Sequence, residues 1–489
     1  MSSLKRAPRA APAATPSAIS YSWSVPPSLT ATNKTERKKN ALLPRSFRAT
    51  PIAISHGEGH ELVTKDGRRL FDISCGAAVT CFGPGRVDRI WNAANRQRDL
   101  LAYHCSAYCE ADIAIEYANA LVASTNGTME WAICYGSGTE ANEAAAKISL
   151  QYHNENGEPS RNLFIGRHQS YHGTTFTTLA IGHHAVRRHP FESSLSSNMT
   201  HVKACNAYRG KKEGQSDEDY VGELKEELEK EFQRLGPENV AAVFIEPVVG
   251  AALGCAPAVP GYLKAMREVC TAHGAHLIFD EIMCGMGRCG YLHASEMEGV
   301  VPDIQTLGKG LAAGAEAFSA MLVGKKIGLA IDRGSAVFMH GHTNQNWLPG
   351  CAAGLEALSM IRECIPNIRK QGALLKESLK VQLGSHAHVG DIRGMGLFLG
   401  LEFVRNKATK EPFERADHIA ERIRAMGTTD PYRIFTYPGT GSADGFKGDH
   451  LIIAPPFNVT EDQIKYIVKQ VTALIKDFFA TMQPIEESF

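Results

Sequence analysis

Short apolar runs alternate with segments of helical periodicity between residues 128 and 325, and this alternation limits the folds that are open to the chain. Each run is bounded by glycine, proline or acidic residues, as buried strands are. The runs cover residues 131–134, 163–165, 240–245, 277–279, 304–307 and 320–323, with helical patterns at 139–152 and 261–273. Such an alternation predicts an α/β fold in which helices cover both faces of a largely parallel sheet.

The chain of 489 residues is too long for one simple core, and its pattern changes near both ends. Residues 50–80 predict a hairpin with Asp66 and Gly67 at its turn, which we expect to lie beside the C-terminal part. After Trp347 the pattern becomes that of a smaller α+β domain, with two strand-like runs joined by glycines at 389–404. We predict a disordered basic tail at 1–40, an N-terminal segment of the small domain at 41–95, a large domain at 96–346 and a C-terminal small domain at 347–489.

The first forty residues are rich in alanine, serine and proline, and seven basic residues face the single acid Glu36. Such a composition buries too little apolar surface to fold by itself. A mitochondrial transit peptide is the functional alternative, but five prolines interrupt the amphipathic helix that such a peptide needs. We therefore predict a cytoplasmic protein and keep a mitochondrial location as the alternative.

The overall composition excludes several classes of partner. Lysine plus arginine and aspartate plus glutamate both number 52, so no net charge favours nucleic acid or a membrane surface. No apolar run approaches the roughly 18 residues that a membrane-spanning helix needs. The twelve cysteines are scattered and lack the paired C-x2-C spacing of a zinc site. We therefore expect reduced thiols and no metal site.

The segment from Gly136 to Glu140 follows a predicted strand and opens a predicted helix. Its glycines allow a ligand to approach the backbone closely, and the amides at a helix N-terminus attract anions. The same residues also suit a simple helix N-cap at Ser137 or Thr139. Taken by itself, the segment is compatible with a phosphate site and with a helix start alone.

Residues 285–290 contain a G-x-G-x-x-G pattern after a predicted strand, as dinucleotide-binding loops do. However, Asp280 and Glu281 stand where the phosphates would approach, and they would repel them. The chain between this pattern and Asp303 is also too short for a crossover helix and a further strand. An NAD-binding oxidoreductase therefore remains only as a less favoured alternative.

Asp280 ends a predicted buried strand, where a carboxylate is costly unless it meets a cation. The protonated ring nitrogen of pyridoxal phosphate is such a cation, and this cofactor also needs a lysine for its Schiff base. Lys309 lies between two glycines at the end of the next apolar run, twenty-nine residues further on. Ligands gather at the strand ends of open parallel sheets. The two residues together predict a pyridoxal phosphate site.

Several motifs, in chain order, resemble those of the class III, or omega, aminotransferases, which are pyridoxal-phosphate-dependent enzymes of fold type I. The motifs are YGSGTEANEAAAK, SYHGTTFTTLAIG, VFIEPVVG, LIFDEIMCGMGRCG, PDIQTLGKGLAAG and HGHTNQNWLPGCAAGLEAL. The resemblance extends from about residue 56 to 475. It implies a large domain with a mostly parallel seven-stranded sheet flanked by helices, and a smaller α+β domain built from both chain ends.

The resemblance also implies roles for individual residues. Lys309 would form the internal aldimine and then move a proton between the substrate Cα and cofactor C4′, while Asp280 would pair with the pyridine nitrogen. The other implied cofactor contacts are Ser137, Gly138 and Thr139 at the phosphate, Tyr171 and Ile282 on the two ring faces, His172 beside Tyr171, Glu246 near the active face, and Thr343 at the phosphate of the neighbouring subunit's cofactor. Simple structural roles remain open for Tyr171 as a half-buried aromatic, Glu246 as a strand cap and Thr343 as a loop hydroxyl.

By this resemblance the chain is expected to be a homodimeric transaminase with shared active sites and pyridoxal 5'-phosphate as cofactor. It would pass an amino group from an amine or amino acid to a keto acid by a ping-pong mechanism. A class III aminomutase or a decarboxylating transaminase would use the same lysine and aspartate. A catalytically silent binding protein on the same fold is the alternative from another class.

The chain departs from the family pattern near the expected substrate entrance. Ile452 stands where ornithine and acetylornithine transaminases carry an arginine for the substrate carboxylate. An aliphatic side chain cannot replace a bidentate arginine, so these two substrates are disfavoured. Arg433 is one candidate replacement. Glu316, Asn344 and Trp347 also differ from the usual family residues, so the amino donor and acceptor stay open.

Overall fold

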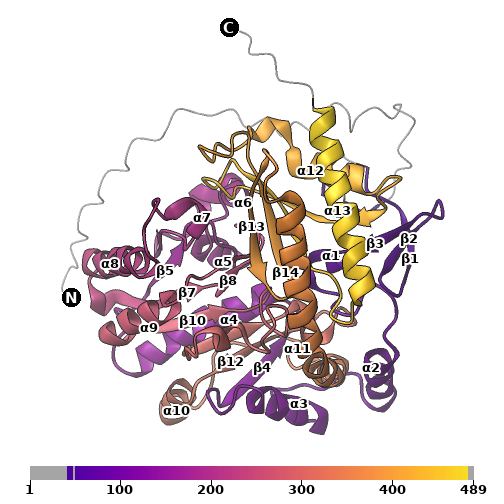
Figure 1. The fold of residues 1–489 in the computed structure, drawn as a ribbon. Coiled ribbons are helices and arrows are strands. Elements are labelled where there is room, and N and C mark those ends of the chain that lie inside the picture. The colour runs from indigo at the N-terminus through magenta and orange to yellow at the C-terminus, as the bar shows by residue number, and fades with distance from the viewer. Residues whose placement is uncertain (1–40, 44, 48–49, 483–489) are drawn as a thin grey trace.

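The computed structural model describes residues 41–43, 45–47 and 50–482 (Figure 1). The basic tail predicted at residues 1–40 lies outside these described residues. A large lobe surrounds a seven-stranded sheet, and a small lobe surrounds a four-stranded sheet. A further four-stranded sheet combines strands from both ends of the chain. None of the helices in the described part of the chain is long and apolar enough to cross a membrane.

The sheet of the large lobe has the strand order β4-β12-β11-β10-β7-β5-β6. Its strands are β4 (Trp131–Tyr135), β5 (Leu163–Arg167), β6 (Met199–Val202), β7 (Val240–Ile245), β10 (His276–Asp280), β11 (Ile304–Leu307) and β12 (Ser319–Val323). The strand β12 runs antiparallel to both neighbours and the rest of the sheet is parallel, which confirms the predicted fold class. Sequence analysis missed β6, an edge strand with the polar residues Thr200 and His201 at its centre.

Helices cover both faces of this sheet because successive strand residues point to opposite sides. Phe244 on β7 and Ile278 on β10 belong to the core beneath α4 and α10. Val243 and Leu277, one position away in each strand, belong to the core beneath α8 and α9. Burial of a side chain such as Phe244 contributes on the order of 2 kcal/mol. These helices are α4 (Gly138–Glu155), α8 (Asp217–Leu235), α9 (Tyr262–His273) and α10 (Lys325–Arg333).

Further elements lie between the strands and helices named so far. They are α1 (Cys75–Ala78), α2 (Asp88–Leu100), α3 (Asp112–Ala123), α5 (Phe176–Ile181), α6 (Ala185–Arg188), α7 (Ala207–Gly210), β8 (Val248–Val249) and β9 (Ala256–Pro257). Single 3-10 turns occur at His189–Ser194, Pro237–Asn239, Ala294–Met297, Lys309–Ala312 and Arg415–Asp417.

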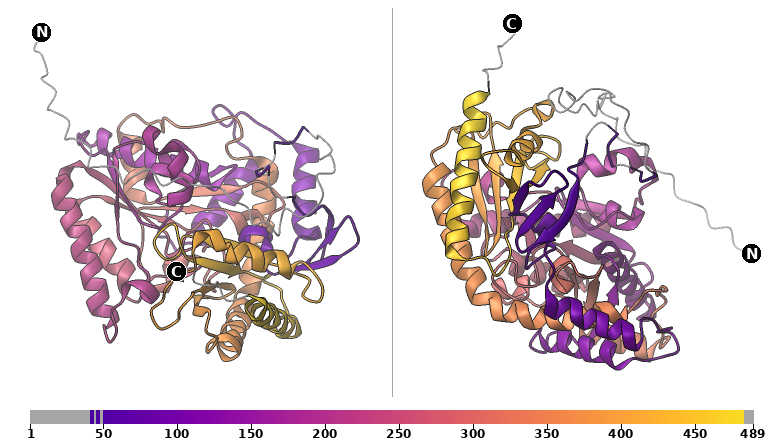
Figure 2. Two further views of the ribbon diagram at one scale, coloured as in Figure 1. Left: turned by 90° about the horizontal axis from the view of Figure 1, so that it is seen from above. Right: turned by 90° about the vertical axis from the view of Figure 1, so that its right-hand side faces the viewer.

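The small lobe is an antiparallel sheet of order β13-β14-β17-β16 with helices on it. Its elements are β13 (Val389–Met395), β14 (Phe398–Phe403), β16 (Tyr437–Thr440), β17 (Asp449–Ile453), α12 (Ile419–Gly427) and α13 (Glu461–Thr481). The long helix α11 (Leu348–Leu383) connects the lobes, because it contacts α2 and α3 as well as β13 and α13. Figure 2 shows α13 running along α11 on the outside of the small lobe.

Strands from the N-terminal and the C-terminal part of the chain pair in the sheet β1-β2-β3-β15. The strands are β1 (Ile54–Glu58), β2 (Glu61–Thr64), β3 (Arg69–Asp72) and β15 (Ile434–Phe435). Asp66 and Gly67 lie in the turn between β2 and β3, so the predicted hairpin is confirmed. Its expected place beside the C-terminal part is also confirmed, because β3 pairs with β15 in parallel. The predicted domain limit at residue 347 remains a proposal, since α11 contacts both lobes.

Candidate active site

Asp280 ends β10, and three hydrogen-bond donors surround its carboxylate. The Asn142 amide donates to Oδ2 over 2.7 Å, and the backbone N–H of Ile282 donates to Oδ1 over 3.0 Å. His172 Nδ1 lies 2.8 Å from Oδ2, so this nitrogen carries the proton of that hydrogen bond. Asp280 is 4% exposed, and a buried carboxylate needs such donors. The arrangement fixes the direction in which Asp280 presents its charge.

Asn142 is a site residue that sequence analysis missed. Its amide also donates to the backbone oxygen of His172 over 2.7 Å, and its side-chain oxygen accepts a 2.7 Å bond from the Thr306 hydroxyl. It therefore joins α4, β11 and the segment after β5 to Asp280. The signal in the sequence was an asparagine within an alanine-rich stretch of helix. In the structure its amide is fully buried, which indicates a hydrogen-bonded network. The sequence does not show the partners in that network.

Lys309 follows β11, the parallel neighbour of β10, so it lies at the same edge of the sheet as Asp280. Its φ is 47°, a left-handed conformation that costs a non-glycine residue on the order of 1 kcal/mol. Burial lowers the pKa of Lys309, while Asp280 and Glu246 raise it and Arg187 lowers it. A lysine in such surroundings releases its proton more readily than an exposed one.

Ile282 lies between the start of α4 and the residue before Lys309. A Cβ atom at Gly138 would be 2.6 Å from Ile282 Cδ1, and one at Gly308 would be 3.2 Å from Ile282 Cγ2. Glycine at both positions leaves the space that the isoleucine side chain occupies. The structure thus places Ile282 against Gly138 and against Gly308, the residue before Lys309.

The start of α4 is capped by its own side chains. Ser137 Oγ accepts a hydrogen bond from the Glu140 backbone N–H over 3.3 Å, and Glu140 Oε2 accepts one from the Ser137 N–H over 2.8 Å. The helix-cap interpretation of Ser137 therefore describes a real contact. Thr139 Oγ1 faces Gly173, where a Cβ would come within 2.8 Å of it. Phosphate binding at these residues remains a prediction.

Glu246 follows β7 and holds the backbone that carries Tyr171. The Tyr171 N–H donates to Oε1 over 3.1 Å, and the Gly250 N–H donates to Oε2 over 3.0 Å. Burial raises the pKa of Glu246, and the nearby His172 opposes this rise. Glu246 thus caps two backbone N–H groups, which is the structural role that the sequence left open for it. It also lies close enough to Lys309 to raise the pKa of that lysine.

Arg187 is a second residue that sequence analysis missed. Its guanidinium carbon lies 4.3 Å from the centre of the Tyr171 ring. The next residue, Arg188, has a structural role, because its Nη1 donates to the backbone oxygens of Leu179, Ala180 and Gly182. Within the described residues, Arg187 has no carboxylate partner. Two adjacent arginines look alike in a sequence, and only their contacts separate these two.

The contacts of Arg433 do not support it as a replacement for the arginine that ornithine and acetylornithine transaminases use to bind the substrate carboxylate. Arg433 is about half exposed, and its Nε donates to Asp430 over 2.5 Å. Ile452 lies on β17 and is 1% exposed, within an apolar cluster. Ile452 therefore offers no positive charge in place of the arginine that ornithine and acetylornithine transaminases carry at this position.

Two of the departures from the family pattern contact each other. Trp347 Nε1 donates to Glu316 Oε2 over 3.1 Å, and Glu316 also forms an ion pair with Arg98 on α2. The Glu316 carboxylate and the Trp347 indole are therefore hydrogen-bonded partners at the start of α11. Thr343 is exposed in the loop between α10 and α11, and no hydrogen bond in the described part of the chain involves its side chain.

Comparison with known proteins agrees with this geometry. The family described as aminotransferase class-III matches residues 43–475. An aminotransferase of Gibberella zeae is 44% identical over 87% of this chain and 84% of its own length. An uncharacterized aminotransferase of Schizosaccharomyces pombe is 38% identical over 93% of this chain and 98% of its own. An amine transaminase from an uncultivated Pseudomonas species, solved in its PLP-bound internal aldimine form, has a TM-score of 0.83 and 28% identity, covering 91% and 100%.

The chain therefore belongs to the class III aminotransferase family, and it is a pyridoxal-phosphate-dependent transaminase of fold type I. The predicted family, enzyme class and cofactor are confirmed. The residues present suit that cofactor: a buried carboxylate with one oxygen that accepts a single backbone hydrogen bond, a lysine of lowered pKa, and glycines that leave space between them. Among the described residues, no group of three His, Cys, Asp or Glu side chains could hold a metal ion.

Proposed function

We propose that this transaminase moves an amino group from an amine or amino acid to a keto acid in two half-reactions at one site, which is a ping-pong mechanism. The observation that carries the proposal is the position of Lys309 and Asp280 at the ends of adjacent parallel strands. When bound, pyridoxal phosphate supplies an aldehyde that reacts with amines and a ring that withdraws electrons from the substrate Cα.

In this proposal Asp280 supplies a negative charge, and Lys309 transfers the proton. Asp280 would hold the protonated ring nitrogen of the cofactor, and its hydrogen bonds to Asn142 and His172 keep the carboxylate in place. Lys309 would be the amine that holds the cofactor covalently and, once released from it, would take the proton from the substrate Cα. Its lowered pKa favours the neutral amine, which is the form that can do both.

The remaining predicted residues position the cofactor. Ser137, Gly138 and Thr139 hold its phosphate at the N-terminus of α4, where backbone amides point at an anion. Tyr171 and Ile282 cover the two ring faces, His172 lies beside Tyr171, and Glu246 anchors Tyr171 through its backbone. Thr343 serves the neighbouring subunit of a homodimer. Leu100, Tyr108 and Met339 are large apolar side chains that are 82%, 90% and 71% exposed, and a homodimer interface would cover them.

We also infer that Arg187 binds the substrate carboxylate. The guanidinium lies over Tyr171, influences the pKa of Lys309 and has no acidic partner among the described residues. A carboxylate binds best to an arginine that is not already paired. The substrate class would then be α-amino or ω-amino acids and keto acids, rather than amines without an acid group.

Borohydride reduction of the purified protein followed by peptide mass mapping tests the assignment. We expect the added mass of the reduced cofactor on the peptide that contains Lys309, and no such mass in a Lys309→Ala variant. Mass at another lysine in the variant would refute the role of Lys309. Product analysis with a panel of amino donors and keto acids separates the alternatives: an isomerised amino acid indicates an aminomutase, and released carbon dioxide indicates a decarboxylating transaminase.

A further inference from the structure

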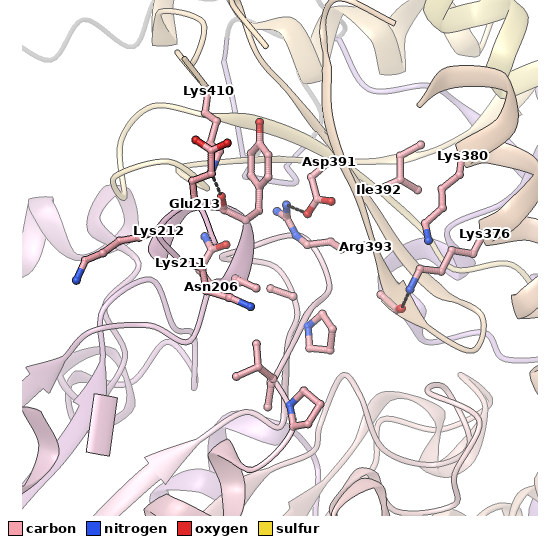
Figure 3. Close-up of a pocket in the computed structure, with 18 of the residues that line it drawn as sticks. Asn206, Lys211, Lys212, Glu213, Lys376, Lys380, Asp391, Ile392, Arg393 and Lys410 are labelled. Carbon is pink, nitrogen blue, oxygen red and sulfur yellow. Dashed lines mark hydrogen bonds and ion pairs between the residues drawn. The ribbon is translucent and has the colours of Figure 1, made fainter. Parts of the chain in front are cut away.

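A pocket of about 820 Å³ lies between the two lobes, and none of the residues assigned to the cofactor lines it (Figure 3). One wall comes from the large lobe, from residues 206–208, 211–213 and 256–260. The other comes from the small lobe and the second half of α11, through Lys376, Lys380 and residues 391–394. A volume of this size is within the usual range of small-molecule sites, roughly 300–1,000 Å³.

The two walls are joined by a preformed contact. Arg393 on β13 donates through Nε to the backbone oxygens of Leu253 and Gly254 in the large lobe, over 3.1 and 3.0 Å. The same guanidinium contacts Asp391 over 3.0 Å and Glu402 over 2.6 Å. Its hydrogen-bonding capacity is therefore used within the protein. A ligand in the pocket would contact an Arg393 side chain that is already held in place. The lysines around the pocket would therefore have to recognise the ligand.

The pocket concentrates positive charge in a chain whose formal net charge is zero. Its cationic side chains outnumber its acidic ones by six to two. The cations are Lys211, Lys212, Lys376, Lys380, Arg393 and Lys410, and the acids are Glu213 and Asp391. Concave surfaces that carry charge of one sign attract ligands of the opposite sign.

Only part of this charge is neutralised by the protein. Lys211, Lys212 and Lys380 have carboxylate partners in Asp217, Glu223 and Glu377. In contrast, Lys376 donates to the Gly394 backbone oxygen over 2.9 Å, and Lys410 donates to the Tyr208 backbone oxygen over 2.7 Å. A backbone oxygen orients an ammonium group but does not cancel its charge. Burial lowers the pKa of Lys376 and Lys380 one turn away lowers it further, while the nearby acids Asp391 and Glu377 oppose this decrease without forming an ion pair with Lys376.

An apolar surface adjoins the charged groups. Residues 256–260 read Ala-Pro-Ala-Val-Pro along one wall, and Ile392 lies on the other. The pocket therefore offers ammonium groups for an anion and an apolar wall for an organic body. Lysines act as point charges and suit phosphate, whereas carboxylates are best held by a free guanidinium fork, which Arg393 no longer provides.

We propose that this pocket binds a small phosphorylated molecule of the nucleotide type. Lys376 and Lys410 hold its phosphate groups, and its organic part lies against residues 256–260. The bound molecule contacts both lobes and stabilises their arrangement, because a ligand that binds only the folded chain raises its stability.

The test is calorimetric titration of the full-length, cofactor-loaded protein, whose cofactor phosphate site is already filled. Adenosine triphosphate and inorganic pyrophosphate should bind with affinities that fall as salt rises, and adenosine should bind at least about tenfold more weakly than the triphosphate. If neither adenosine triphosphate nor pyrophosphate binds at millimolar concentration, the proposal is wrong. Equal binding of adenosine and the triphosphate also overturns it, because the phosphates would then contribute nothing.

Variants locate the site. Lys376→Met with Lys410→Met should weaken triphosphate binding by about tenfold or more, and Lys376→Arg with Lys410→Arg should largely restore it. Lys370→Met is the matched control: Lys370 also lies on α11, is 67% exposed and pairs with Glu461, so its loss should change the affinity less than twofold. Wild-type affinity in the double methionine variant would place the anion elsewhere. Cofactor absorbance should stay normal in all variants, which separates this proposal from the assignment of Lys309.

Discussion

At the scale of single residues, Asn142 shows how much the Asp280 carboxylate depends on its neighbours. Replacing Asn142 by alanine leaves Asp280, the His172 backbone oxygen and the Thr306 hydroxyl each without one partner. We expect the free energy of unfolding to fall by about 2 kcal/mol. We also expect the affinity for pyridoxal phosphate to fall by about 10- to 100-fold, as measured by titration of the cofactor-free protein.

Asn367→Ala provides the matched control for this prediction. The Asn367 amide donates to the backbone oxygens of Phe457 and Val459 over 2.8 and 3.0 Å, so its removal costs similar hydrogen bonds elsewhere. The control should lose stability and keep its cofactor affinity. An equal loss of cofactor affinity in both variants would show that Asn142 acts only through general stability.

Glu281 gives a pH-dependent prediction. It is fully buried beside Asp280 and accepts a 2.9 Å hydrogen bond from the Ser295 N–H, and burial raises its pKa to about 7. Because the folded pKa lies above the unfolded value, the contribution of Glu281 to stability is present below pH 4.5 and is lost as pH rises to 7. Glu281→Gln should therefore gain about 3 kcal/mol relative to the wild type over this range.

Urea unfolding at pH 4.5 and pH 8 measures this difference. Glu218→Gln, which changes an exposed acid in the first turn of α8, should follow the wild type at both values. A difference between Glu281→Gln and wild type that does not change with pH would contradict the prediction.

Arg187 makes the substrate class testable. Arg187→Met should raise the KM for amino acid donors by about 10- to 100-fold, because a charged hydrogen bond is lost. The KM for donors without a carboxylate should stay within about twofold of the wild-type value. Arg187→Lys should fall between the two, since lysine keeps the charge and loses the bidentate geometry. Equal effects on both kinds of donor would remove Arg187 from substrate binding.

The sequence points to candidate site residues that belong to ordered motifs, and it does not point to candidates whose contacts arise only from the fold. Lys309 and Asp280 stand out because a charged residue at the end of an apolar run needs an explanation. Asn142 and Arg187 lie in ordinary helical and loop segments, and their importance comes from contacts with residues far along the chain. Arg433 looked like a possible carboxylate ligand until its pair with Asp430 was known.

At the scale of elements, Glu316 and Trp347 connect the segment after Lys309 to the start of α11. Glu316→Ala and Trp347→Phe should each destabilise the protein, and the double variant should lose about 1 kcal/mol less than the sum. A double-mutant cycle from urea unfolding measures this coupling. Additive losses would mean that the two departures from the family pattern are independent.

Periodicity predicted the buried strands well because they are apolar on both faces, as β7 and β10 are. It failed for β6, which lies at the edge of the sheet and carries polar side chains. The length of α11 was also not predicted, because Pro366 lies within its 36 residues and such a residue usually ends a helix. Contacts with both lobes hold this helix together across the proline.

At the scale of the whole molecule, the proposed homodimer can be tested by sedimentation. The wild-type protein should have twice the mass of one chain, and Leu100→Glu with Tyr108→Glu should shift it towards the monomer, because charges would replace exposed apolar side chains. Val381→Glu is the control, since Val381 is 78% exposed on the second half of α11. A monomeric wild type, or dissociation by the control alone, would contradict the proposal.

The parallel pair of β3 and β15 also sets an order in time. Phe71 is hydrogen-bonded to the backbone of Arg433, about 360 residues later in the chain. A ribosome adds roughly 5–20 residues per second, so β3 waits on the order of 20–70 s for this partner. During that interval the three strands β1, β2 and β3 leave the edge of their sheet at β3 without its partner strand. The strands β1, β2 and β3 are therefore among the last to complete their sheet although they are synthesised early, and a chain cut short before residue 433 keeps the β3 edge exposed.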